Sequence, residues 1–150
     1  MSYDRMPLTK LTGGIYRSTQ AYLNEVLEKY QLGSGTYPFL LTLYRKEGIN
    51  QNQISRDLDI DKAMSARTIK KLVDLGYIRK EPDLLDSRAY LLFLTEKGRM
   101  IIPDIKRESE IWTDIITRSL DDTNKKKLLE LLEIVFHETK HYRNKQKVEE

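Results

Sequence analysis

The chain has 150 residues, of which 39% are hydrophobic and 33% charged, and it contains no cysteine. This length suits one domain over residues 1–150, and the lack of cysteine excludes disulfides, thiolate metal sites and thiol redox sensing within the chain. The longest apolar runs are a few residues, too short to span a bilayer, and the first ten residues lack the apolar segment of a secretory signal. We therefore expect a cytoplasmic protein with no membrane partner.

Two helices are predicted in the first third of the chain. Residues 13–30 place apolar and aromatic side chains at helical spacing, and Gly33 and Gly35 end that helix. Thr36 begins a second helix, which Gly48 stops.

A helix-turn-helix pattern follows. The first helix covers Gln51–Leu58, and residues 59–61 form the turn. Asp61 is placed to cap the second helix, Lys62–Leu75, because its carboxylate can accept a main-chain N–H of the first turn. Gly76 is placed to end that helix in the left-handed conformation.

A hairpin and a long helix come next. Tyr77–Lys80 and Ala89–Leu94 predict two strands joined by a loop at Pro82–Ser87. The following helix is predicted from a Thr95 cap to Ser119. The fold class is therefore mainly α with a small β-wing.

The terminal helices carry much apolar surface for a compact monomer of this size. The last helix opens at Asp121 and Asp122, and we expect its polar end, 140–150, to fray. Its apolar side chains recur at helical spacing: Leu128, Leu131, Leu132 and Val135. We expect the helices of 8–33 and 99–150 to pair with a second copy, giving a homodimer, while packing against their own domain is the alternative.

Positive charge is concentrated in one stretch. The net charge is +3, yet residues 62–80 hold six cations and one anion. Phosphate binding depends on such clustering, although a solvated helix face would show it too.

The second helix of the pair presents a face suited to the major groove. Its outward positions are short, flexible or basic: Lys62, Ala63, Met64, Ala66, Arg67, Lys70 and Lys71. Its inward positions are Ser65, Thr68, Ile69 and Leu72. Arg67 is the best candidate for a base edge, because its fork matches guanine O6 and N7. Ala63 and Met64 permit close approach or contact with a thymine methyl, and Lys70 and Lys71 are expected at phosphates.

The hairpin carries Arg88 near its tip, two residues after Asp86. We expect the carboxylate to orient the guanidinium before it enters a narrow minor groove, whose negative potential attracts arginine. A hairpin ion pair of little energetic value is the alternative.

This order of elements, followed by the string DSRAYLLFLTEKG, resembles the MarR family of winged helix-turn-helix regulators. The family hallmark is Asp-x-Arg, a few apolar residues, then Leu-Thr-x-x-Gly. It matches Asp86-Ser87-Arg88, Leu94-Thr95 and Gly98 here.

The resemblance implies a winged helix-turn-helix lobe at 36–98 and a homodimer whose terminal helices interlock. It implies binding to a pseudo-palindromic operator in double-stranded DNA, one recognition helix and one wing per half-site. The positions that match groove-lining recognition residues are Ala63, Met64, Arg67 and Thr68, and Arg88 matches the minor-groove arginine.

The resemblance further implies a ligand-responsive repressor, which releases DNA when a small aromatic or phenolic effector binds between the dimerisation helices and the DNA-reading unit. The corresponding cleft would involve Tyr16, Tyr37, Leu40, Tyr44 and Ile101. Aromatic side chains at helical spacing also occur in ordinary cores, which is the alternative for these five. No cofactor is implied.

Four positions depart from the family pattern. The turn position often filled by glycine is Asp59, and aspartate enters the left-handed region more readily than most residues. Leu84 and Leu85 stand at the wing tip, where the family is usually polar. Met64 replaces a commonly small polar residue, so the operator sequence cannot be transferred from relatives.

One motif points to another class of function. His137-Glu138-Thr139-Lys140-His141 matches H-E-x-x-H, the pattern of a zinc-dependent hydrolase. A catalytic zinc needs a third protein ligand, but the chain has no other histidine and only nine residues follow His141. We expect no metal site and no enzyme. A helical protein-interaction module without DNA binding is the remaining alternative.

Overall fold

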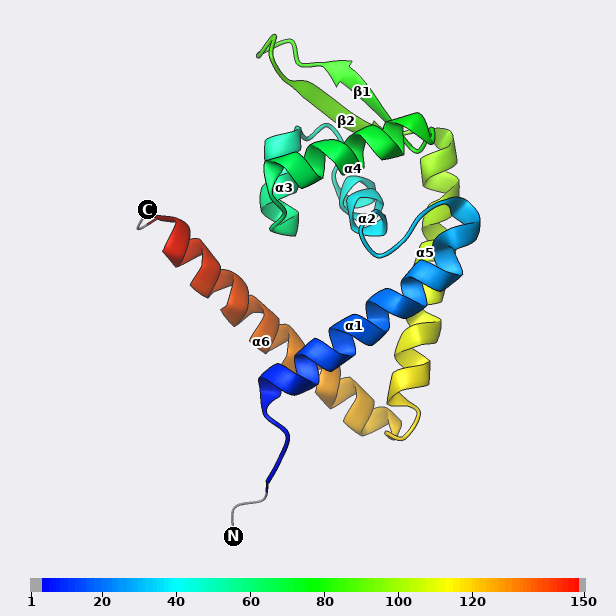
Figure 1. Ribbon diagram of the computed structural model, residues 1–150, viewed down its shortest axis with the longest axis vertical. Helices are drawn as coiled ribbons and strands as arrows, with labels where there is room; N and C mark the ends of the chain where they lie inside the picture. The colour runs from blue at the N-terminus through cyan, green and yellow to red at the C-terminus, as the bar shows by residue number, and fades with distance from the viewer. Residues whose placement is uncertain (1–3, 149–150) are drawn as a thin grey trace. The chain divides into compact units, whose positions relative to one another are not determined.

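The computed structural model describes residues 4–148 (Figure 1). Its elements are α1 (Leu8–Leu27), η1 (Glu28–Tyr30), α2 (Tyr37–Arg45), α3 (Gln51–Leu58), α4 (Lys62–Asp74), β1 (Ile78–Pro82), β2 (Tyr90–Leu94), α5 (Glu96–Thr117) and α6 (Asp122–Val148). The predicted fold class, mainly helical with a two-stranded wing, is confirmed. The chain forms two compact units that divide between Trp112 and Thr113.

Local signals fix the helix-turn-helix. Asn50 and Gln53 form a capping box at the start of α3, an extra signal beyond those predicted. Asp59 adopts the left-handed conformation with φ 53°, as expected for the turn. Asp61 caps α4, its Oδ1 accepting the Met64 N–H at 2.8 Å, and Gly76 follows the helix with φ 80°. These predictions are confirmed.

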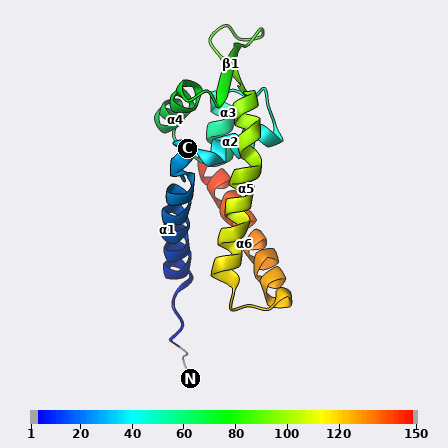
Figure 2. The same ribbon diagram turned by 90° about the vertical axis from the view of Figure 1, so that its right-hand side faces the viewer.

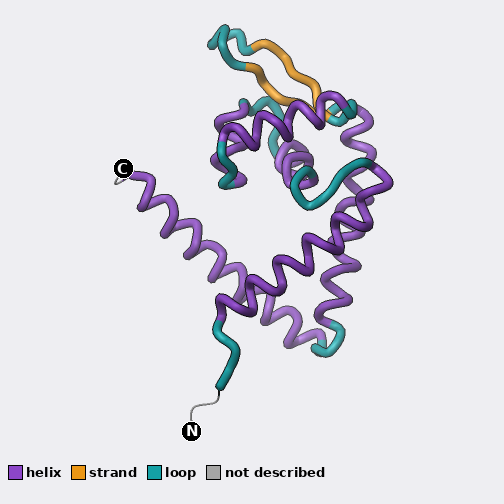
Figure 3. The backbone as a smooth tube through the Cα atoms, viewed as in Figure 1, coloured by secondary structure: helices purple, strands orange, loops and turns teal. Residues whose placement is uncertain are grey.

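The wing is an antiparallel hairpin in which Ile78 pairs with Leu94 and Pro82 pairs with Tyr90 (Figure 3). The connection between the strands covers residues 83–89, so the predicted loop at Pro82–Ser87 began one residue too early and ended two residues too early. A proline is tolerated at a strand end because its missing N–H removes no interior ladder bond. The segment before α3 also joins the wing, since Ile49 forms a bridge with Leu92.

Several predicted helix ends were wrong. The first helix begins at Leu8 instead of residue 13 and continues through Gly13 and Gly14, because two glycines cost a helix only about 1 kcal/mol each. α5 ends at Thr117 instead of Ser119. α6 continues to Val148 where we expected fraying from residue 140, since lysine, arginine and glutamine are good helix formers. Residues 149–150 lie outside the described part.

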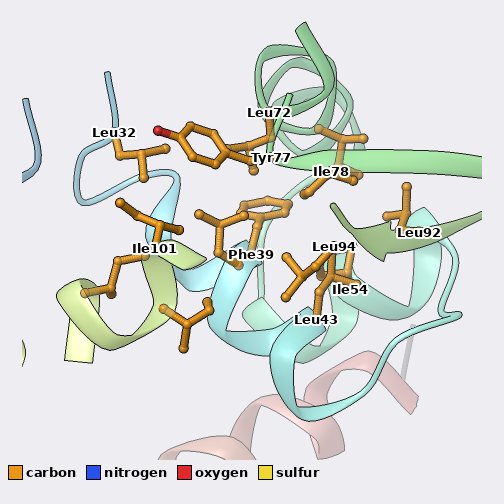
Figure 4. Close-up of a cluster of buried hydrophobic side chains, with 14 of the residues drawn as sticks. Leu32, Phe39, Leu43, Ile54, Leu72, Tyr77, Ile78, Leu92, Leu94 and Ile101 are labelled. Carbon is orange, nitrogen blue, oxygen red and sulfur yellow. The ribbon is translucent and has the colours of Figure 1, made fainter. Parts of the chain in front are cut away.

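One hydrophobic core joins the wing, the helix-turn-helix and the neighbouring helices (Figure 4). Phe39 and Leu43 of α2 lie at its centre, with Leu72 of α4 and Ile78 and Leu94 of the wing around them. Ile101, Ile102 and Ile105 of α5 are also buried. This core fixes α4 against the wing.

Polar side chains connect α1 to α5. Trp112 Nε1 donates to Thr19 Oγ1 at 2.8 Å, and its ring stacks on Tyr22 with centroids 4.7 Å apart. The Tyr22 hydroxyl donates to Glu108 at 3.0 Å and the Tyr30 hydroxyl donates to Asp104 at 2.7 Å. The two helices are thereby held along much of their length.

The Asp104 carboxylate gives this contact a pH dependence. The hydrogen bond from Tyr30, and then the Arg107 guanidinium at 2.7 Å, hold the pKa of Asp104 below its ordinary value of 3.8. A carboxyl with a depressed pKa stabilises the fold above that ordinary value and loses the contribution as the pH falls through the folded-state pKa.

We therefore expect Asp104→Asn to lower the free energy of unfolding at neutral pH. The difference in this free energy between variant and wild type should disappear as the pH falls below 3.8. Urea unfolding between neutral and acid pH measures this gap. Tyr30→Phe is the matched control, since it keeps the carboxylate and its arginine and should show a smaller gap. A gap of the same size at every pH would mean that the substitution acts through packing.

Candidate nucleic-acid interface

The outward face of α4 is the centre of the interface, on the outer side of its unit and next to the wing (Figures 1 and 2). Ser65, Ile69 and Leu72 are buried and Thr68 is half-buried. All seven positions predicted to face outward are exposed: Lys62, Ala63, Met64, Ala66, Arg67, Lys70 and Lys71. The predicted division of the helix is confirmed.

Both ends of α4 are held in place. At the start, Gln51 Nε2 donates to the Lys62 carbonyl at 3.0 Å and ties α4 to α3. At the other end, the Tyr77 N–H donates to the Leu72 carbonyl at 2.9 Å as the chain turns into the wing. A side chain such as Arg67 is thus presented from a rigid support, which preserves the geometry that base reading needs.

The two lysines of the last turns differ in their surroundings. Lys70 Nζ lies 2.7 Å from Asp74 in an ion pair whose side chains are 75% and 60% exposed. Such a pair contributes little to stability, so a phosphate can replace the carboxylate at small cost. Lys71 lines a cavity of about 550 Å³ together with Glu25 and Glu28. Lys71 thus shares this cavity with a glutamate of α1 and a glutamate of η1.

The wing places its arginine beside α3. Arg88 and Lys80 line a cavity of about 260 Å³ with Asn50, Gln51 and Asn52 at the start of α3. A helix N-terminus beside two cations favours an anion such as a phosphate. Sequence reasoning assigned no role to Lys80, Gln51 or Asn52. The sequence contained two indications of this site, since Lys80 belongs to the cationic stretch of residues 62–80 and Asn50 precedes the first residue of a helix.

Asp86 acts differently from the prediction. Its Oδ1 accepts the main-chain N–H of Arg88 at 2.9 Å. Among the ion pairs between described residues, none joins this carboxylate to the Arg88 guanidinium. Asp86 therefore shapes the loop backbone that carries Arg88.

The structure places the predicted effector residues in different surroundings. Leu40 is fully buried in the core. Tyr44 lines a cavity of about 480 Å³ with Lys106, whose ammonium lies 4.5 Å from the ring centroid. Ile101 lines a separate cavity of about 630 Å³.

The remaining two tyrosines are neighbours outside both cavities. Tyr16 is 62% exposed. Burial, and then the proximity of Tyr16, raise the pKa of Tyr37. These two residues are therefore close enough to interact with one another.

His137 and His141 lie one turn apart on α6. Over residues 4–148, no three His, Cys, Asp or Glu side chains are grouped to hold a metal ion. Within the same residues, none of the helices combines the length and the apolarity needed to cross a membrane.

Sequence comparisons agree with this geometry. The MarR family model matches residues 36–90. The regulator BilQ of Clostridioides difficile, described as HTH-type, is 31% identical over 128 residues, which cover 85% of this chain and 86% of BilQ. The uncharacterized HTH-type transcriptional regulator YybA of Bacillus subtilis is 32% identical over 80% of each chain.

Solved structures agree as well. A MarR transcriptional regulator from Methanosarcina mazei Go1 is 42% identical with a TM-score of 0.85, over 88% of this chain and 95% of that one. A crystal structure of MarR superposes with a TM-score of 0.89 at 29% identity, over 97% and 98%. These relatives are DNA-binding transcription regulators and not enzymes. The chain belongs to the MarR family of winged helix-turn-helix transcriptional regulators.

Proposed function

We propose that this regulator is a homodimeric, sequence-specific repressor that binds a pseudo-palindromic operator in double-stranded DNA. The observation that carries the proposal is α4, whose buried face is fixed in the core while the exposed positions from Lys62 to Lys71 carry short, flexible or basic side chains around Arg67. In this proposal Ala63, Met64 and Arg67 read bases, and the lysines contact phosphates.

A second copy is the partner we propose for the apolar residues of the terminal helices. They are at least 36% exposed in the single chain: Leu8, Leu11, Ile15, Ile111, Ile115, Ile116, Leu128, Leu129, Leu131, Leu132, Ile134, Val135 and Phe136. Large exposed apolar surfaces mark interaction sites. A two-fold dimer would present two copies of α4 to half-sites about one helical turn apart.

The effector is proposed as a small aromatic or phenolic molecule that lowers DNA affinity. The cavities that contain Tyr44 and Ile101, of about 480 and 630 Å³, have the size of small-molecule sites. Both are lined in part by α5, the helix that follows the wing.

Because a regulator of this kind acts on the chromosome, we propose that the protein is cytoplasmic.

The test begins with selection of bound genomic fragments by the purified protein, followed by affinity measurements over a range of salt concentrations. We expect the logarithm of affinity to fall steeply with the logarithm of salt, by about 0.9 per phosphate contacted, and half-sites about 10 bp apart. Sedimentation at micromolar concentration should show a dimer.

Three outcomes would count against the proposal. A monomer in sedimentation would contradict the dimer, and transcription that rises with bound protein would contradict repression. An affinity for DNA that does not change with salt would favour the protein-interaction alternative.

A further inference from the structure

The wing tip exposes two leucines almost completely. Leu84 and Leu85 are each 98% exposed, more than any other large apolar side chain among the described residues. They make no contribution to the core, so their apolar surface is available for another molecule.

The loop backbone holds these leucines in a defined position. Asp83 Oδ1 accepts the Leu85 N–H at 2.9 Å, and the Asp83 N–H donates to the Ala89 carbonyl at 3.1 Å. The Ala89 N–H donates in turn to the Asp86 carbonyl at 3.1 Å. These bonds close the loop on both sides of the leucines. The tip is therefore preorganised, which reduces the entropy lost when it binds.

The charges of the wing separate two kinds of contact. The cations Lys80 and Arg88 line the cavity at the start of α3. Residues 82–87 hold two aspartates and no cation. The tip therefore brings no cation to a phosphate, and the groups that it can offer to the sugars and base faces of a groove are its two leucines.

We propose that Leu84 and Leu85 form an apolar wedge that enters the minor groove beside each half-site, next to Arg88. The inference rests on the DNA-binding function proposed above and extends the same surface along the wing. Apolar side chains in a minor groove partly separate neighbouring base pairs and bend the duplex. The wedge therefore adds a preference for flexible pyrimidine–purine steps at positions where no base edge is read.

The test compares wild type with the double variant Leu84→Ser/Leu85→Ser on two operator fragments. One carries a TA step at the flank and the other a stiff A-tract. Because both side chains are exposed, the variant should keep the wild-type melting temperature and oligomeric state. We expect it to bind the TA operator about tenfold or more weakly, since that much affinity corresponds to the apolar area of one leucine. We also expect it to lose the preference for TA over the A-tract.

Two further variants separate the wedge from other effects. Leu84→Met/Leu85→Met keeps apolar side chains of similar volume and should retain the preference. Arg88→Ala should weaken binding mainly on A·T-rich flanks, because arginine is attracted to a narrow minor groove. A 2-aminopurine base at the TA step should fluoresce more with wild type than with the serine variant, because unstacking relieves its quenching.

The failures are distinguishable. If the serine variant binds both operators as wild type does while Arg88→Ala loses affinity, the wedge is rejected and the DNA-binding function stands. If the serine variant binds normally but no longer regulates a reporter gene, the leucines contact a protein, which also rejects the wedge. If wild type binds no DNA, the proposed function itself fails.

Discussion

Gly98→Ala is expected to lower the free energy of unfolding by about 3 kcal/mol, the upper part of the range for an overpacked core. A Cβ at this position would lie 2.2 Å from the Tyr77 carbonyl oxygen and 3.2 Å from Leu94 Cδ2. The nearest obstacle is main chain, so it cannot rotate away. The same oxygen accepts the Thr95 N–H at 3.0 Å, so moving it would also disturb the start of α5.

Gly14→Ala is the matched control for this experiment. Gly14 lies inside α1, and a Cβ there would meet nothing within 4 Å. We expect this variant to gain about 0.5–1 kcal/mol from helix propensity. Urea unfolding of both variants at one protein concentration measures the difference, with the concentration fixed because dimerisation adds to stability. A Gly98→Ala protein as stable as wild type would show that α5 and the wing do not approach so closely.

Arg67→Ala is expected to weaken binding to the selected operator by about 1–3 kcal/mol, roughly five- to 150-fold, and to relax the preference at one base pair. The physical reason is the loss of two parallel hydrogen bonds to one guanine. Arg67 is exposed on the outward face of α4, so its removal leaves the core intact. Competition binding against operators changed one base pair at a time measures the loss.

Lys70→Ala is the control for Arg67. This lysine is 75% exposed and pairs with Asp74 on its own helix, so its removal should lower affinity by a similar factor on every operator. It should also make the salt dependence less steep by about one phosphate contact. If Arg67→Ala instead behaved like Lys70→Ala, with unchanged discrimination among operators, Arg67 would be a phosphate contact and not a base reader.

The turn and cap positions show how much of the site the sequence could predict. Asp59, Asp61 and Gly76 were placed correctly because their roles depend on neighbours within four residues: a left-handed turn, a first-turn cap and a helix stop. The inward and outward faces of α4 were equally predictable, because a period of 3.6 residues assigns each side chain to one face.

The hydrogen-bond partner of a loop side chain and the cavity that a residue lines were not predictable in this way. Asp86 was expected to bind the Arg88 guanidinium, but its carboxylate accepts the Arg88 main-chain N–H instead. A loop carboxylate can accept a hydrogen bond from either a side chain or the main chain, and only the folded loop selects between them. Tyr44 and Ile101 lie in different cavities, since α5 presents successive turns to different neighbours.

The sequence by itself determined the helix-turn-helix, the wing, the basic recognition face and the family, because all of these depend on local periodicity, capping residues and short motifs. Only the tertiary structure decided why Gly98 must be glycine, how Asp104 joins Tyr30 and where Lys80 and Arg88 meet α3. The physical reason is distance along the chain. Tyr30 and Asp104 are 74 residues apart, and their contact exists only once the core has brought α5 against η1 and α1.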